Sequence, residues 1–298
     1  MAIIAIGIGG ALTLASVVKS LFPPSSLAQN LSARIKSWWW IVMALAVASL
    51  AGRIGLVILF AGVSFVALRE FSAVAASRPA DRRVTAACFF VVLPLQYALV
   101  GIGHLVWFAG ILPLACLALL PVLTALTGDT QDYLARVSES VLGVAICIYC
   151  LSYVPALLTL QAARDGVELP LFLILITQAS DVLQYVWGKT LASHLLAPEV
   201  SPSKTVEGLI GGIGCATALG AALCWMTPFS TAQAGAIAFL ISVAGFFGGF
   251  VMSAIKRDRG IKDWSGLLPG HGGILDRVDS LWLSAPLYFY VVRALAVA

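Results

Sequence analysis

Charged side chains are scarce in this chain of 298 residues: Asp, Glu, Lys and Arg make up 11% of it, whereas hydrophobic residues make up 60%. The mean hydropathy is +0.99. The core of one soluble domain of this length cannot hold so much apolar sequence, but a lipid bilayer can. The apolar runs are also continuous and do not alternate as barrel strands do. We therefore predict an all-α, polytopic integral membrane protein.

The chain also lacks the features of several other classes. Its net charge of +4 is small and its cations are scattered, which argues against a nucleic-acid-binding protein. All six cysteines lie inside apolar runs, so we expect no disulfide framework. Cys147 and Cys150 form a C-x-x-C pair, but apolar neighbours favour core packing over redox or metal chemistry. The first apolar run has no basic segment before it and no cleavage site after it, so we expect a retained helix.

Nine apolar runs approach or exceed the roughly 20 helical residues that a bilayer crossing needs. They lie at about 2–22, 38–69, 84–101, 104–127, 138–160, 169–188, 206–226, 230–253 and 280–297. The second run is too long for one straight crossing and too short for two, so we predict one long or kinked helix, interrupted at Gly52-Arg53. We divide this single membrane domain into N-terminal helices, 1–160, and a C-terminal region, 161–298, that carries the polar motifs.

Lys and Arg are unevenly distributed among the connections. Connections 69–83, 128–137, 189–205 and 254–279 hold twelve of them, and the others hold three: Arg34, Lys36 and Arg164. The positive-inside rule places the four cation-rich connections in the cytoplasm, with the N-terminus inside and the C-terminus outside. The cations that follow the first run favour the opposite orientation for that run, but the totals decide our prediction.

The segment 253–279 is the polar exception. It holds Lys256, Arg257, Asp258, Arg259, Lys262, Asp263, His271, Asp276, Arg277 and Asp279. Asp276 and Asp279 are three residues apart and share one side of a helical turn, a spacing that suits Mg²⁺ if a substrate supplies phosphate oxygens. Favourable charge at a helix start is the alternative. The glycines around His271 bring backbone N–H groups close to a ligand, so we predict a functional histidine in this loop.

Two further clusters precede this segment. The stretch 201–208 has the order Ser, Lys, Thr, Glu and then glycines that open a helix, which suits an anion at a helix N-terminus. A capped helix at the membrane surface explains the same stretch without a ligand. Asp181 lies inside an apolar run, where an ionisable residue is expensive and predicts a site. Its candidate partners are Lys189, Lys204 or a metal.

Together these motifs resemble the phosphatidate cytidylyltransferases. The family signature is Ser-x-apolar-Lys-Arg, four residues, Lys-Asp, and then Pro-x-His-Gly-Gly-apolar-x-Asp-Arg-apolar-Asp, which this chain matches from Ser253 to Asp279. An upstream Asp-x-x-x-Tyr-x-x-Gly is matched by residues 181–188, and Ser-Pro-x-Lys-Thr-x-Glu-Gly by residues 201–208. One position departs from the pattern: Gly249 stands where family members usually have Asp, four residues before the signature serine.

The resemblance implies transfer of a cytidylyl group from CTP to phosphatidate, giving CDP-diacylglycerol and pyrophosphate, at the cytoplasmic face of a bacterial-type inner membrane. It implies Mg²⁺ bound by Asp181, Asp276 and Asp279. It also implies nucleotide binding by Asp181, Ser201, Lys204, Thr205, Glu207, Gly272 and Gly273, and catalytic roles for Lys256, Arg257, Lys262, Asp263, His271 and Arg277. A monovalent cation such as K⁺ in the site and a homodimer both stay open.

Two other functions fit the sequence less well. A CTP-dependent polyprenol kinase also meets CTP and a lipid in a membrane bundle, but the intact Asp-Arg-Val-Asp at 276–279 disfavours it. A transporter or lipid-binding protein that has lost catalysis belongs to another class, and Gly249 supports that alternative.

Overall fold

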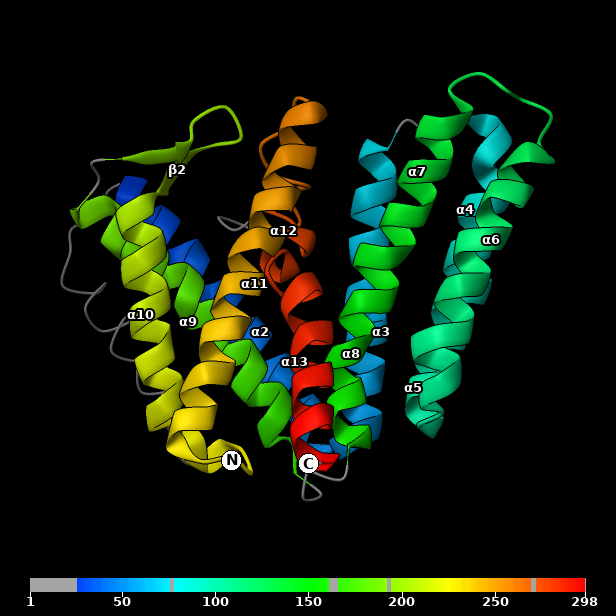
Figure 1. The fold of residues 1–298 in the computed structure, drawn as a ribbon. Coiled ribbons are helices and arrows are strands. Elements are labelled where there is room, and N and C mark those ends of the chain that lie inside the picture. Colours follow the sequence, from blue (N-terminus) through cyan, green and yellow to red (C-terminus); the bar gives the residue numbers. More distant parts are fainter. Residues whose placement is uncertain (1–25, 76–77, 161–165, 192–193, 269–271, 298) are drawn as a thin grey trace.

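The computed structural model describes residues 26–75, 78–160, 166–191, 194–268 and 272–297 as a bundle of helices (Figure 1). Within these ranges six helices are long and apolar enough to cross a membrane: Gly52–Val74, Pro79–Ile102, Trp107–Ala125, Tyr133–Thr159, Glu168–Thr190 and Thr231–Asp258. Shorter apolar helices cover Trp38–Leu50 and Val206–Ala222. The predicted all-α membrane fold is confirmed. The predicted first run, 2–22, lies outside the described residues.

The second apolar run forms two helices, so the prediction of one long or kinked helix was wrong. α2 (Ser26–Leu50) ends just before Gly52, and α3 (Gly52–Val74) begins there. Gly52 has φ +64°, a left-handed conformation that glycine adopts without the steric cost of a Cβ. The chain therefore reverses at this residue, and α3 runs back along the bundle (Figure 1).

The other N-terminal helices each include a π-helical stretch. They are η1 (Pro79–Asp81) with α4 (Arg82–Ala87), η2 (Cys88–Val92) and α5 (Leu93–Ile102); η3 (Trp107–Ile111) with α6 (Leu112–Ala125); and α7 (Tyr133–Val144) with η4 (Ala145–Cys150), α8 (Leu151–Ala156) and η5 (Leu157–Thr159). Side chains bond to two carbonyls of η3: Gln96 donates to Phe108 O at 3.0 Å, and Tyr149 donates to Ala109 O at 2.9 Å. Both cysteines of the C-x-x-C pair are buried in η4, as predicted.

The C-terminal half includes a short antiparallel hairpin, which lies at one end of the bundle (Figure 1). Its elements are α9 (Glu168–Thr190), β1 (Leu195–Ala197), β2 (Ser201–Thr205), α10 (Val206–Ala222), η7 (Cys224–Met226), α11 (Thr231–Asp258), α12 (Leu275–Val278) and α13 (Leu281–Val297). α10 packs closely on α9 because glycines face that helix. A Cβ on Gly208 would lie 2.7 Å from the backbone oxygen of Gln184, and one on Gly212 would lie 2.4 Å from Cγ of Gln184. The G-x-x-x-G spacing of Gly208 and Gly212 thus allows close helix packing.

The described parts of all four cation-rich connections lie at one end of the bundle, which we call the cation-rich end (Figure 1). Side chains join these connections to one another. Arg78 donates to Asp132 at 2.9 Å, and Arg259 at the end of α11 forms an ion pair with Glu139 of α7. The positive charge that the sequence scatters over four connections is therefore gathered on one face of the molecule.

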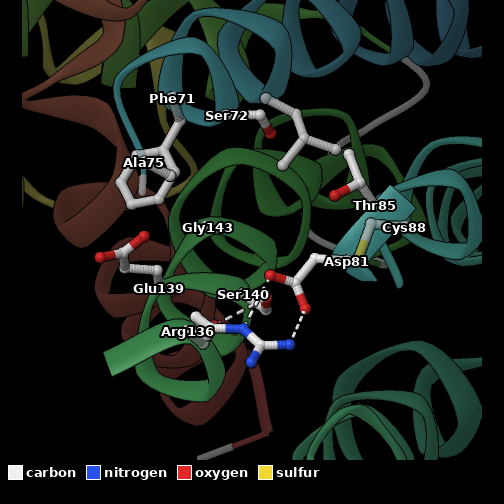
Figure 2. Close-up of a pocket in the computed structure, with 11 residues that line it drawn as sticks. Phe71, Ser72, Ala75, Asp81, Thr85, Cys88, Arg136, Glu139, Ser140 and Gly143 are labelled. Carbon is white, nitrogen blue, oxygen red and sulfur yellow. Dashed lines mark hydrogen bonds and ion pairs between the residues drawn. The ribbon is translucent and has the colours of Figure 1, made fainter. Parts of the chain in front are cut away.

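A buried ion pair holds part of this end together. Arg136 of α7 faces Asp81 of η1 beside a small cavity (Figure 2), with Nη2–Oδ1 and Nε–Oδ2 distances of 2.5 and 2.8 Å. The two side chains are 2% and 7% exposed. Arg136 Nη1 also donates to the carbonyls of Asp129 and Gln131. One guanidinium thus fixes the link between α6 and α7 against the start of α4.

Replacing Arg136 with Met is expected to lower the free energy of unfolding by roughly 3 kcal/mol, because Asp81 would stay buried without a partner. Arg78→Met is the matched control. Its ion pairs are partly exposed, and exposed pairs contribute about 0–1 kcal/mol. Unfolding of both variants in detergent, followed by circular dichroism, measures the difference. Equal and small losses would show that the buried pair does not stabilise this end.

Candidate functional site

A cavity of about 260 Å³ lies between α9, β2, α10, α11 and α12. Its walls are formed by Asp181, Gln184, Tyr185, Ser203, Lys204, Thr205, Gly208, Leu209, Phe246, Gly249, Ser253, Asp276, Arg277, Asp279 and Ser280. Residues of all three sequence motifs therefore meet at one cavity, although the motifs lie far apart along the chain.

Lys204 enters the cavity from the hairpin. Its strand ends at Thr205, which caps α10 by accepting a hydrogen bond from Gly208 N at 3.0 Å. The Lys204 ammonium donates to the carbonyl of Phe246 at 3.3 Å and lies 4.3 Å from the centre of the Phe246 ring. No carboxylate of the described residues lies within ion-pair distance of it. Burial lowers the pKa of Lys204, and the nearby charges of Asp181 and Asp279 oppose that shift.

Arg277 is a second cation of the cavity wall without an ion-pair partner among the described residues. Its backbone carbonyl accepts a hydrogen bond from Gln178 at 3.3 Å, which fixes α12 against α9. The Nε of its guanidinium is buried and makes no hydrogen bond to the described residues. A guanidinium in a cavity wall without an ion-pair partner is suited to bind an anion.

Two carboxylates face these cations. Asp181 of α9 accepts a hydrogen bond from Ser280 Oγ at 2.7 Å. Asp279 makes no hydrogen bond or ion pair with the described residues, and burial together with the charge of Asp181 raises its pKa to about 7. Carboxylate oxygens that are free to coordinate are the ligands that Mg²⁺ prefers. The donor set of Asp279 and Asp181 therefore fits this ion.

The described residues contain no group of three or more His, Cys, Asp or Glu side chains that could hold a metal ion. Asp181, Asp276 and Asp279 were predicted to bind a metal together, but in this structure they do not form such a group. Mg²⁺ is commonly bound by one or two carboxylates together with substrate phosphates and water. A divalent ion in this cavity would therefore need oxygens from its substrate.

Asp276 differs from Asp279 because its carboxylate is fully bonded. Its Oδ1 accepts from Lys256 Nζ at 2.8 Å, and its Oδ2 accepts from the backbone N–H groups of Trp264 and Gly273, both at 2.9 Å. The Lys256 and Asp276 side chains are 11% and 4% exposed. In this arrangement the carboxylate fixes the loop between α11 and α12, and a metal would have to displace Lys256 to bind both of its oxygens.

Six predicted residues line the cavity: Asp181, Lys204, Thr205, Asp276, Arg277 and Asp279. Eight do not: Ser201, Glu207, Lys256, Arg257, Lys262, Asp263, Gly272 and Gly273. Arg257 is exposed and donates to the carbonyl of Ile261, and Glu207 contacts His194 in the hairpin connection. Lys262 and Asp263 are exposed in the loop. His271 and its neighbours Pro269 and Gly270 lie outside the described residues.

Two residues of the cavity wall that were not predicted contact predicted site residues. Ser280 donates to Asp181, and Phe246 forms the surface under Lys204. The sequence carried a signal for each. Ser280 follows Arg277 by three positions, and Phe246 precedes Gly249 by three, so each lies on the same helical face as a motif position.

Gly249, the position that departs from the family pattern, lies in the cavity wall. A Cβ there would lie 3.4 Å from Ser280 Oγ, 3.5 Å from Lys204 Nζ and 3.9 Å from Asp279 Oδ2. A carboxylate at this position would therefore reach the cation and the carboxylate that the cavity already contains.

Comparison with known proteins identifies the family. A sequence model of the cytidylyltransferase family matches residues 32–295. The uncharacterized protein YnbB of Escherichia coli strain K12 is 37% identical over 276 residues, 91% of this chain and 90% of that protein. The phosphatidate cytidylyltransferases of Staphylococcus aureus strain COL and Staphylococcus saprophyticus are each 34% identical over 152 residues, 50% of this chain and 58% of theirs. Since the family match covers most of the chain, this protein belongs to the cytidylyltransferase family, as its motifs predicted.

Proposed function

We propose that this protein transfers the cytidylyl group of CTP to phosphatidate and releases pyrophosphate. The observation that carries the proposal is the content of the cavity. Lys204 and Arg277 are cations without ion-pair partners among the described residues, and they face the carboxylate of Asp279, which is likewise unpaired there. Unpaired cations bind phosphates, and free carboxylate oxygens bind the divalent ion that accompanies a nucleoside triphosphate. The names of the staphylococcal relatives support phosphatidate as the acceptor.

The proposed reaction suits this cavity because its nucleophile, a phosphate oxygen, needs little activation. An oxygen of the lipid phosphate attacks the α-phosphorus of CTP, the bond to the β-phosphate oxygen breaks, and pyrophosphate leaves. The attacking oxygen is already anionic, so no strong general base is required. The protein must bring two polyanions together and stabilise the charge that moves to the leaving group.

The residues of the cavity divide this task. Arg277 and Lys204 would bind phosphate oxygens from two sides, and Ser280 orients the Asp181 carboxylate. Asp279 and Asp181 would hold Mg²⁺, which neutralises triphosphate charge when bound. Lys256 acts through Asp276, with which it is paired, and keeps α12 in place.

We place this site at the cytoplasmic face of a bacterial-type inner membrane. Of the fifteen Lys and Arg residues in the connections between apolar runs, twelve belong to the four connections at the cation-rich end (Figure 1). The N-terminal end of α2, which carries two of the other three, points to this end as well (Figure 1). This direction of α2 removes the conflict between the early cations and the positive-inside rule. CTP is supplied on that side of the membrane.

Incubation of the purified protein with Mg²⁺, phosphatidate and CTP labelled at the α-phosphate is expected to move the label into CDP-diacylglycerol and to release an equal amount of pyrophosphate. Phosphorylated prenol and CDP, formed from a polyprenol, would instead indicate the kinase. Bound phosphatidate without nucleotide turnover would indicate a non-catalytic lipid-binding protein. Either result would overturn the proposal.

Asp279→Asn and Asp276→Asn are expected to separate a role in chemistry from a role in structure. The first should reduce turnover by about 100-fold or more, which corresponds to roughly 3 kcal/mol of transition-state stabilisation. It should leave thermal stability near that of the wild type at pH 7, because a carboxyl whose pKa is raised on folding destabilises the fold when it ionises. The second should lower thermal stability, since buried Lys256 would lose its charged partner.

Turnover and the midpoint of thermal unfolding, measured on both variants in detergent, test this distinction. Near-normal turnover in a well-folded Asp279→Asn variant would remove Asp279 from the reaction. An unchanged unfolding midpoint in Asp276→Asn would show that the Lys256 pair does not hold the loop.

Gly249→Asp is expected to lower the Mg²⁺ concentration that gives half-maximal activity. The added carboxylate would start within 4 Å of Asp279 and would supply another oxygen ligand. Gly249→Asn is the matched control, because it adds the same volume without the charge. A Mg²⁺ requirement that rises in the Asp variant, or that falls equally in both variants, would contradict a metal in this part of the cavity.

A further inference from the structure

Glu70 is a buried carboxylate of α3 that lies outside the cavity. Glu70 is 5% exposed and lies in a helix that is long and apolar enough to cross a membrane. A buried carboxylate in such a helix is costly unless hydrogen-bond donors surround it. Its donors come from the segment between α11 and α12, 195 to 205 residues further along the chain.

Three hydrogen bonds join Glu70 to this segment. Oε1 accepts from Ser265 Oγ at 2.6 Å and from Ile274 N at 3.0 Å, and Oε2 accepts from Leu275 N at 2.8 Å. The next residue of α3, Phe71, stacks on Trp264 with ring centres 5.5 Å apart. One turn of α3 thus contacts both ends of the loop.

The fit between Glu70 and this loop is close. A Cβ on Gly273 would lie 2.5 Å from Oε2 of Glu70, so only glycine leaves room for the carboxylate. The backbone N–H of Gly273 donates to Asp276, whereas the next two N–H groups donate to Glu70. Two carboxylates therefore hold successive peptide groups of one turn.

This turn determines where the cavity residues lie. Leu275 is the first residue of α12, and Arg277 and Asp279 follow within the next turn of the chain. Both of these line the cavity, and neither is held there by an ion pair with a described residue. Their position depends on the backbone of α12, which the two carboxylates hold at its start and the Gln178 hydrogen bond holds at Arg277.

We infer that Glu70 is a positioning residue of the reaction: it contacts no substrate, but it fixes α12 so that Arg277 and Asp279 face the cavity. The kinetic part of this inference rests on the proposed function. Displacement of reacting groups by about 1 Å costs up to about 100-fold in rate, so loosening this turn is expected to be visible in turnover. The inference also makes α3, in the N-terminal half, part of the catalytic unit.

Glu70→Gln is the sharpest test because it keeps the shape of the side chain. Each carboxylate oxygen accepts from at least one backbone N–H, so the amide NH₂ would face a backbone donor in either orientation. We expect kcat to fall about 10- to 100-fold. KM for CTP should change less, because Lys204 lies on the hairpin, which Glu70 does not contact. Ser265→Ala removes one donor and leaves both backbone bonds, so its loss should be smaller.

Two further measurements separate positioning from simple loss of folding. Glu168→Gln makes the same chemical change at the start of α9, at the opposite end of the bundle, and is expected to keep the wild-type kcat (Figure 1). Hydrogen exchange needs no substrate: Glu70→Gln should exchange faster in the peptide that contains Ile274 and Leu275, with exchange in α10 unchanged.

Unchanged exchange in that peptide, or a wild-type kcat per folded molecule in Glu70→Gln, would overturn the inference. A wild-type protein that turns over neither CTP nor phosphatidate would overturn the proposed function, and the positioning role with it. Faster exchange would then still show that Glu70 clamps the loop. The two failures are therefore distinguishable.

Discussion

The Asp276 carboxylate is the group on which the site depends. It joins α11 through Lys256, the following loop through Trp264, and the start of α12 through Gly273. A buried charge is costly unless hydrogen-bond donors surround it. The loss of one of these three contacts is therefore expected to weaken the other two. Once α12 is fixed in this way, the next residues of the chain point into the cavity without needing partners of their own.

The bilayer explains why the polar groups are arranged as they are. Lipid offers no hydrogen bonds, so polar side chains inside the bundle must bond to one another or to the backbone. The buried Asp81–Arg136 pair and the Glu70 contacts follow this rule near the cation-rich end. Lys204, Arg277 and Asp279 have no ion-pair partner among the described residues, and this contrast distinguishes the candidate site from the structural polar contacts around it.

Much of the fold and part of the site could be predicted from the sequence. Continuous apolar runs fix an all-α membrane bundle because hydropathy and length leave few alternatives. The break at Gly52 was misread because hydropathy does not report the sign of φ. The motifs brought Asp181, Lys204 and Arg277 to one cavity. They did not show that Arg257 points away from it, since neighbouring residues of a helix diverge by about 100°. Glu70 was missed because its partners are nearly 200 residues away.

The absence of ion-pair partners for Lys204 and Arg277 among the described residues has a consequence for affinity. Burial has already removed part of the water around the Lys204 ammonium when the bundle folds, so part of the desolvation cost belongs to folding and not to association. A phosphate that enters the cavity does not have to displace a resident carboxylate, and most of the new hydrogen bond therefore contributes to binding. Under the proposed function, the protein would keep cations without ion-pair partners, at a cost to its own stability, for an anion that it releases after each turnover.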